Sequence, residues 1–304
     1  MGSAKGMARG LTLLSIRKDG EVRLAARTPR GILDVVEAAR LLGMQGPKTM
    51  DELLQGEDGL RLEALVKAAL DRAQAAGAFS AEEGISYAPL VGRPEKIVCV
   101  GLNYRRHAAE IGQPIPKQPV LFSKYNVALN AHGGTIELPV GIARKFDHEV
   151  ELVIVMGKLA RNVPEAEALS YVAGYATGND FTARDLQLET GGQWLLGKTP
   201  DGFAPLGPYL VTADQIDPDR LAIECRVNGE TRQSSNTSDL IFGCRQVIAY
   251  VSRTFTLRPG DVIYTGTPEG VILGKPPGQQ VWLKPGDAIA CSVEKLGELR
   301  FTLM

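Results

Sequence analysis

Three regularly placed carboxylates are the first residues in this 304-residue chain that could do chemistry. Glu149 and Glu151 stand at the head of an apolar run, residues 150–156, which we expect to form a buried strand. Residues i and i+2 of a strand share a face, so both carboxylates point the same way. Asp180 follows a second apolar run, which ends at residues 177–179.

The three carboxylates are candidate ligands for a divalent cation. Burying like charges together is costly unless a cation neutralises them. A set of carboxylates without Cys or His suits a hard ion such as Mg²⁺, Mn²⁺ or Ca²⁺ better than Zn²⁺. The Glu-x-Glu spacing of Glu149 and Glu151 by itself fits two solvated glutamates at a strand end equally well.

His107 and Glu110 form a second candidate site. They lie at i and i+3 in the polar segment 105–111, where two helical turns would put them on one face, within hydrogen-bonding reach. A histidine oriented by a carboxylate is prepared to act as a general base. From the pair alone, a surface ion pair on a mobile loop is the favoured interpretation. Lys198, just before the turn at 199–202, is by itself interpreted as an ordinary surface lysine.

The composition is that of a soluble globular protein, with 44% hydrophobic and 23% charged residues. A net charge of −1 gives no electrostatic reason to expect nucleic acid or an anionic membrane as a partner. Four scattered cysteines in apolar segments indicate reduced core residues of a cytoplasmic protein. No apolar run reaches transmembrane length, and the first ten residues lack a signal-peptide core, so we expect them to be a flexible tail.

Residues 8–92 are predicted to form a small N-terminal α+β domain. Strand-like runs at 11–16 and 22–26 flank an Asp-Gly pair, which predicts a hairpin. Helices are predicted over 32–42, closed by Gly43, and over 62–73, with Gly77 as its C-cap. This domain shows no catalytic constellation, so packing or oligomer contact is its expected role.

Residues 93–304, after a linker at 92–94, are predicted to form a β-rich domain with short strands. The following features support this prediction: strands over 97–100, 120–124 and 135–138; a hairpin at 221–229; a helix over 240–254 capped by Asp239; and Pro-Gly-Asp turns at 259–261 and 285–287. The small, donor-rich residues 265–268 fit either an anion-binding loop or a plain loop.

Six phrases in this second part resemble the fumarylacetoacetate hydrolase superfamily. They are GLNYRRHAAEIG, FDHEVELVIVMGK, GYATGNDFTARDLQ, GKTPDGFAPLGP, VNGETRQ and LRPGDVIYTGTPEGV, within residues 96–304. The resemblance implies a β-rich α+β fold, with a mixed β-sandwich roll. It also implies a homodimer with one divalent metal ion, Mg²⁺ or Mn²⁺, in each active site. The N-terminal domain resembles that of the longer bacterial members, which include diketo-acid hydrolases and isomerases.

The resemblance also implies roles for individual residues. Glu149, Glu151 and Asp180 would hold the metal, and His107 and Glu110 would be the catalytic pair on a lid that orders over the substrate. Lys198 would be a third catalytic residue that faces the substrate. The remaining substrate contacts would be Tyr104, Arg184, Gln187, Gly266 and Thr267.

One position departs from the pattern of many acylpyruvases and oxaloacetate decarboxylases, which have a basic residue where this chain has Leu102. The phrase GLNY is more similar to the branch that acts on diketo sugar acids and on ring-cleavage products of aromatic catabolism. The missing contact to a substrate carboxylate is therefore either absent or supplied by Arg105, Arg106 or Arg184.

The resemblance and the residues together indicate chemistry on a small 2-oxo or 2,4-dioxo acid. A metal ion that binds the 2-oxo acid through its carboxylate and keto oxygens would stabilise an enolate. We expect a hydrolase of an acylpyruvate or fumarylacetoacetate-like substrate, with His107 activating the water that cleaves a C–C bond. Alternatives are an isomerase of the 2-hydroxyhepta-2,4-diene-1,7-dioate or 5-carboxymethyl-2-hydroxymuconate type, and an oxaloacetate decarboxylase. A ligand-binding protein that retains the fold is the non-enzyme alternative, against which the complete residue set argues.

Overall fold

The computed structural model describes residues 6–56 and 58–304. Of the ten residues predicted to be a flexible tail, the first five lie outside the described residues. For residues 6–10 the prediction is wrong. Gly6 forms a bridge with Asp58, and the backbone N–H of Arg9 donates to Glu63 Oε1 at 2.8 Å. These long-range contacts hold the segment against the N-terminal helices.

The N-terminal part is a four-stranded sheet covered by helices. Its strands are β1 (Thr12–Lys18), β2 (Glu21–Thr28), β3 (Gly31–Asp34) and β4 (Phe79–Ser80), and its helices are α1 (Val35–Leu42), α2 (Met50–Gly56) and α3 (Gly59–Asp71). The predicted hairpin between β1 and β2 is confirmed. Its two turn residues, Asp19 and Gly20, have φ of 53° and 79°, as expected for the primed turn that matches strand twist.

Both helix predictions in this part need correction. The helix predicted from residue 32 begins at Val35, because residues 32–34 pair with β2 and the Asp34 side chain caps the helix by accepting from the N–H of Glu37. The predicted C-cap Gly43 is confirmed, with φ of 64°. The second helix, α3, ends at Asp71, and Gly77 lies inside a following 3₁₀ helix instead of capping α3.

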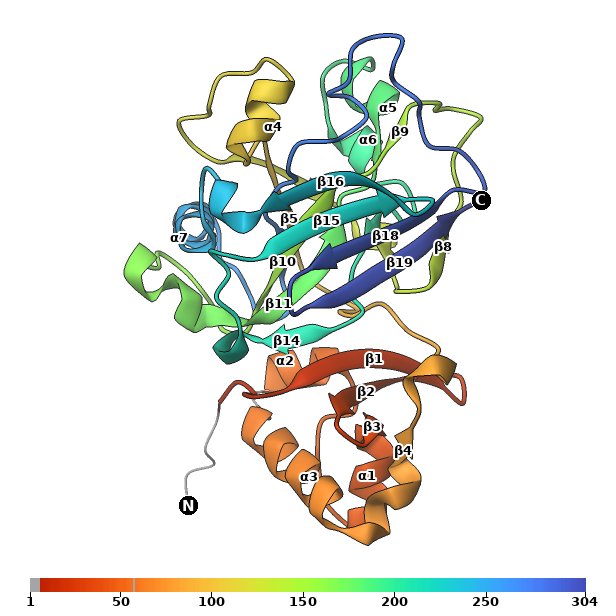
Figure 1. The fold of residues 1–304 in the computed structure, drawn as a ribbon. Helices are drawn as coiled ribbons and strands as arrows, with labels where there is room; N and C mark the ends of the chain where they lie inside the picture. The colour runs from red at the N-terminus through yellow and green to blue at the C-terminus, as the bar shows by residue number, and fades with distance from the viewer. Residues whose placement is uncertain (1–5, 57) are drawn as a thin grey trace.

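The four N-terminal strands continue into the main sheet of the molecule. The order of this ten-stranded sheet is β4-β3-β2-β1-β14-β11-β10-β17-β5-β6. The six further strands are β5 (Ile97–Gly101), β6 (Val120–Lys124), β10 (Val150–Met156), β11 (Val172–Asn179), β14 (Leu210–Thr212) and β17 (Val262–Tyr264). Leu13 of β1 pairs with Leu210 of β14, which joins the two parts (Figure 1). The division into domains of residues 8–92 and 93–304 stays a prediction.

A second sheet, of five strands, packs on the first (Figure 1). Its order is β16-β15-β18-β19-β8, formed by β8 (Gly134–Ile136), β15 (Ala222–Val227), β16 (Glu230–Asn236), β18 (Ala288–Val293) and β19 (Gly297–Leu303). Strands β10 and β11 contact β15, β18 and β19 across the sandwich. Burial of these apolar inner faces forms the core, and the β-rich α+β sandwich expected from the sequence is confirmed.

Short elements close the ends of the sandwich. Two small ladders pair β7 (Leu129–Asn130) with β13 (Ala204–Pro205) and β9 (Phe146–Asp147) with β12 (Thr182–Ala183). The helices here are α4 (Arg105–Glu110), α5 (Arg184–Leu188), α6 (Leu195–Lys198) and α7 (Cys244–Thr254). None of the described helices is long and apolar enough to span a bilayer.

Helix α7 begins four residues later than the sequence predicted, and Asp239 does not cap it. The segment before it is held in another conformation. The side chain of Asn103 accepts from the N–H of Phe242 and donates to its carbonyl, and Leu240 bridges to Tyr104. The helix therefore starts after Gly243, whose N–H donates to Gln246 Oε1 at 3.0 Å.

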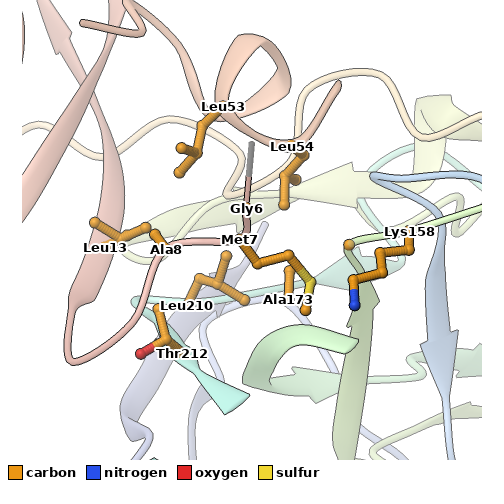
Figure 2. Close-up of a pocket in the computed structure, with 11 residues that line it drawn as sticks. Gly6, Met7, Ala8, Leu13, Leu53, Leu54, Lys158, Ala173, Leu210 and Thr212 are labelled. Carbon is orange, nitrogen blue, oxygen red and sulfur yellow. The ribbon is translucent and has the colours of Figure 1, made fainter. Parts of the chain in front are cut away.

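A small apolar cavity of about 130 Å³ lies where the N-terminal part meets the main sheet (Figure 2). Leu53 and Leu54 of α2 line one side, and Ala173 and Leu210 line the other. Met7 fills the space beside it, since an ideal Cβ on Gly157 would lie 2.2 Å from the Met7 sulfur. The described residues that line the cavity include no titratable cluster, so we interpret it as a packing defect at the junction.

Candidate active site

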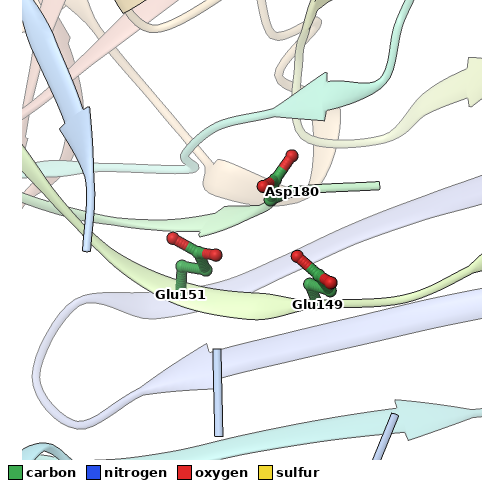
Figure 3. A group of neighbouring side chains, drawn as sticks. All are labelled: Glu149, Glu151 and Asp180. Carbon is green, nitrogen blue, oxygen red and sulfur yellow. The ribbon is translucent and has the colours of Figure 1, made fainter. Parts of the chain in front are cut away.

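The strand pair β10–β11 brings the three predicted carboxylates together. Glu149 precedes β10, Glu151 lies on it, and Asp180 follows β11 (Figure 3). The antiparallel register pairs Glu151 with Gly178, and the N–H of Asp180 donates to the carbonyl of Glu149 at 2.9 Å. One carboxylate oxygen from each of the three lies within 4.8 Å of the others, and all three side chains are buried. The alternative of solvated glutamates at a strand end is therefore wrong.

Two lysines are buried against this triad. The ammonium of Lys198, at the end of α6, donates to Glu149 Oε2 at 2.7 Å and to Asp180 Oδ2 at 2.9 Å. Lys198 is thus not the surface lysine that its position before a turn indicated. Lys124, the last residue of β6, lies 2.5 Å from Asp180 Oδ1 and donates to the carbonyls of Phe181 and Phe203.

Arg184 adds a third buried cation. Its Nε donates to Asp147 Oδ2 at 2.8 Å, and its Nη2 lies 2.6 Å from Glu149 Oε1. Its Nη1 donates to Gln187 Oε1 at 3.1 Å. Asp147 is held in turn by the N–H groups of Ile272 and Leu273, at 2.8 and 3.1 Å. This network fixes Arg184 and Gln187 on α5 beside the triad.

The buried cluster carries more negative than positive charge. It contains four carboxylates, of Asp147, Glu149, Glu151 and Asp180, against three cations, of Lys124, Arg184 and Lys198, which leaves a formal charge of −1. Burial alone would raise the pKa of Glu149, but the Lys198 and Arg184 charges lower this pKa to about 2. Burial and the charges of Asp180 and Glu149 raise the pKa of Glu151 well above its usual range.

These residues fit a hard divalent cation. In the part of the chain that the structure describes, Glu151 accepts one hydrogen bond, from the N–H of Gly266 at 2.7 Å, and has no ion-pair partner. A cation between the three carboxylates would offset their mutual repulsion and favour the ionised form of Glu151. Oxygen-only donors of this kind are those that Mg²⁺ and Mn²⁺ prefer.

Replacement of Lys124 tests whether this buried network stabilises the protein. Lys124→Met removes one cation and leaves Asp180 Oδ1 and two carbonyls without their partner, so the free energy of unfolding should fall by about 3 kcal/mol. Urea denaturation in EDTA measures this change. Lys117→Met, at an exposed position, is the control and should change the free energy by less than about 0.5 kcal/mol. Equal midpoints for both variants would contradict the assignment.

The His107–Glu110 pair lies on α4 with His107 only 6% exposed. The two side chains are 3.2 Å apart, from Nδ1 to Oε2. Glu110 Oε1 also accepts from the N–H of Gly270 at 2.9 Å. The pair is therefore anchored to the body of the protein and is not the exposed surface ion pair that the spacing alone favoured. Motion of the segment as a lid stays a prediction.

A cavity of about 760 Å³ brings most of the predicted site together. The predicted residues that line it are His107, Glu110, Glu149, Glu151, Asp180, Arg184, Gln187, Lys198 and Thr267. Two predicted contacts lie outside this lining. Tyr104 is fully buried under α4, and Gly266 uses its N–H on Glu151. Gly266 has φ of 105°, and an ideal Cβ there would lie 2.7 Å from that of Asn103, so only glycine fits.

Of the three arginines proposed to replace a basic residue at position 102, Arg184 lines the cavity, and the other two are engaged elsewhere. Arg105 donates to the carbonyls of Asp239 and Leu240, and Arg106 pairs with Asp239 and Glu269. Neither lines the cavity. Leu102 does line it, in a left-handed conformation with φ of 54° that is uncommon for a branched residue.

Comparison with known proteins agrees with this site. Residues 96–304 match the family described as "Fumarylacetoacetate (FAA) hydrolase C-terminal". The chain belongs to the fumarylacetoacetate hydrolase family. This family assignment confirms the resemblance stated from the six phrases and covers all of the residues that line the cavity.

Three relatives of this fumarylacetoacetate hydrolase family member carry three different reaction names. "Oxaloacetate tautomerase FAHD2A, mitochondrial" of Bos taurus is 46% identical over 255 residues, 83% of this chain and 78% of the relative. The structure of 5-carboxymethyl-2-hydroxymuconate delta-isomerase from Mycobacterium smegmatis is 29% identical, with a TM-score of 0.73 over 96% of this chain and 99% of that chain. The structure of fumarylpyruvate hydrolase from Pseudomonas aeruginosa, in complex with Mn²⁺ and pyruvate, is 37% identical, with a TM-score of 0.62 over 69% and 89%.

Sequence reasoning missed several residues of the site in this family member. Lys124 and Asp147 were not singled out, although both take part in the buried cluster. Trp194, which also lines the cavity, packs edge-on against Phe122 with ring centroids 5.2 Å apart. The one feature of the sequence that could have indicated these residues was a charged residue at the end of an apolar strand, as for Lys124 after VLFS.

Proposed function

We propose that the protein is a divalent-metal-dependent hydrolase that cleaves a C–C bond in a 2,4-dioxo acid. The observation that carries this proposal is one cavity lined both by the carboxylate triad and by the His107–Glu110 pair. An ion held by Glu149, Glu151 and Asp180 would supply Lewis-acid stabilisation of negative charge on the oxygens of the 2-oxo acid. The relative in complex with Mn²⁺ and pyruvate supports Mn²⁺ or Mg²⁺ as that ion.

His107 is the proposed general base. Its Nδ1 faces the carboxylate of Glu110, so the tautomer with the proton on Nδ1 leaves Nε2 to accept a proton from water. The oxygen of that water attacks the C4 carbonyl, and the C3–C4 bond breaks. The electron pair of the broken C3–C4 bond passes to the departing 2-oxo acid, which takes up a proton at C3. Glu110 stabilises the imidazolium that forms when His107 accepts its proton.

Lys198 and Arg184 are the proposed positioning cations. Burial lowers the pKa of Lys198, but Asp180 and Glu149 outweigh it and raise that pKa, so the side chain stays an ammonium. Its two carboxylate contacts hold that ammonium at the wall of the cavity, near the bound acid. Gln187, held by Arg184, and Thr267 offer neutral polar groups on the same cavity.

Keto–enol or double-bond isomerisation is the second candidate. It needs proton transfer by His107 but no attacking water, so the same site could perform it. The 46% identity to an oxaloacetate tautomerase supports this candidate. A binding protein without turnover remains the alternative from another class.

A substrate panel with Mg²⁺ or Mn²⁺ tests the proposal. Acylpyruvates and fumarylpyruvate should be hydrolysed, EDTA should abolish the reaction, and added Mg²⁺ or Mn²⁺ should restore it. Exchange between enol and keto oxaloacetate without any hydrolysis would identify a tautomerase instead. No turnover of any member of the panel would favour a binding protein.

We also propose the homodimer and the cytoplasmic location that the family resemblance and the composition led us to expect. The homodimer rests on that resemblance. The relatives include mitochondrial proteins, so the cytoplasmic location is proposed for this chain and not for the family.

A further inference from the structure

Three residues with cationic side chains line the cavity, and one of them has no ion-pair partner among the described residues. Arg184 and Lys198 each form ion pairs with carboxylates of the buried cluster. Lys275, which is half-buried, forms no ion pair with any residue that the structure describes. Neither the family phrases nor the predicted site included Lys275. An ammonium in a partly enclosed cavity without a counter-charge is a ready partner for an anionic group of a ligand.

The loop that carries Lys275, residues 270–280, is firmly held. The N–H of Gly270 donates to Glu110, and those of Ile272 and Leu273 donate to Asp147. The side-chain amide of Gln280 closes the loop by donating to the carbonyls of Leu273 and Lys275, both at 3.0 Å. Lys275 therefore has a fixed backbone position, which lowers the entropic cost of binding a ligand.

Two prolines and a close glycine contact add to this rigidity. Pro276 and Pro277 follow Lys275 directly and restrict the backbone there. An ideal Cβ on Gly274 would lie 2.4 Å from Glu110 Cδ, so the loop lies directly on the catalytic pair. The cavity wall that carries Lys275 is thus part of the same structure that holds Glu110.

Several lining residues of the cavity are apolar. They are Leu102, Phe122, Leu188 and Trp194, and they offer no charged group. Among the described residues, Lys275 is the cavity-lining cation that is available to a second anionic group, because Arg184 and Lys198 are already paired.

We propose that Lys275 binds a second carboxylate of the substrate, so that the site prefers dicarboxylic 2-oxo acids to monocarboxylic ones. The inference rests on the proposed function, because it takes the 760 Å³ cavity as the substrate site. The first carboxylate and the keto oxygen lie at the triad end. The second carboxylate pairs with the Lys275 ammonium on the 270–280 loop.

Binding of two stable acids of equal chain length tests this inference. Calorimetric titration with Mn²⁺ present compares 2-oxoglutarate, a diacid, with 2-oxopentanoate, a monoacid. The wild-type protein should bind the diacid about tenfold or more tightly than the monoacid. Lys275→Met should remove that preference by weakening only diacid binding, and Lys275→Arg should keep most of it. Lys284→Met, an exposed lysine outside the cavity, is the matched control and should behave as wild type.

Each other outcome overturns the inference. A diacid preference that survives in Lys275→Met places the second carboxylate elsewhere. Equal weakening of both acids makes Lys275 a structural residue, and a wild-type protein that binds neither acid or shows no preference leaves Lys275 without this role. The titration needs no turnover. A wild-type diacid preference that Lys275→Met removes, in a protein that hydrolyses no 2,4-dioxo acid, would therefore contradict only the proposed hydrolase reaction.

Discussion

Asp180→Asn should abolish tight Mn²⁺ binding and catalysis together. The substitution keeps the size of the side chain but removes one charge from a buried cluster whose formal charge is −1. Three carboxylates would then face three cations, so the cluster would lose its excess negative charge together with one anionic ligand. We expect the affinity for Mn²⁺ to fall by at least about 100-fold, since loss of outer partners alone costs 10–100-fold. Glu149→Gln should act in the same direction, because it also removes a charged ligand.

Calorimetric titration with Mn²⁺ and turnover of an acylpyruvate measure the two effects in parallel. Asp201→Asn makes the same chemical change at an exposed turn outside the cavity and should bind Mn²⁺ as wild type does. Circular dichroism of Asp180→Asn must show a folded protein for the comparison to count. An unchanged affinity in folded Asp180→Asn would remove this residue from the set of ligands.

The carboxylate triad could be predicted because local periodicity determines where its side chains point. Two glutamates at i and i+2 share a face of any strand, and the apolar run after them identified the strand as β10. Asp180 was found because it ends a second apolar run, β11, that is long enough to be buried. Antiparallel pairing of the two strands then brings both ends together.

The buried cations could not be predicted, because long-range contacts determine their environment. Lys198 stands before a turn, a position typical of exposed lysines, yet α6 packs where its ammonium reaches Glu149, 49 residues away in sequence. Lys124 contacts the backbone of Phe181, 57 residues away. The periodicity of a window of about ten to twenty residues cannot reveal contacts between residues that lie so far apart in the sequence.

The predicted starts of two helices were wrong for a related reason. Leu240 has the spacing of an inward helical residue, but Asn103 holds the neighbouring Phe242 backbone, so the helix starts only at Cys244. Ile32 likewise fits a helix and instead pairs in β3. In both cases a tertiary hydrogen bond or strand partner overrides local helix propensity.

His107→Ala should slow hydrolysis of a 2,4-dioxo acid by roughly 10²–10⁴, or about 3–5 kcal/mol of barrier, with Mn²⁺ affinity unchanged. The imidazole pairs with Glu110 and forms no ion pair or hydrogen bond with the triad in the part of the chain described, so its loss leaves the metal ligands in place. Glu110→Gln should cost less, because the imidazole remains and loses only its orienting charge. Single-turnover kinetics beside calorimetric titration with Mn²⁺ separate the two effects.

His132→Ala provides a matched control for that experiment. Its ring packs edge-on against Tyr87, with centroids 4.6 Å apart, and does not line the 760 Å³ cavity, so hydrolysis should proceed at the wild-type rate. Decarboxylation of oxaloacetate, if it occurs, needs no activated water and should suffer less than hydrolysis in His107→Ala. Loss of Mn²⁺ affinity together with activity would give His107 a structural or ligand role. Hydrolysis by His107→Ala at the wild-type rate would leave the His107–Glu110 pair with only a structural role, in which Glu110 holds α4 to the 270–280 loop.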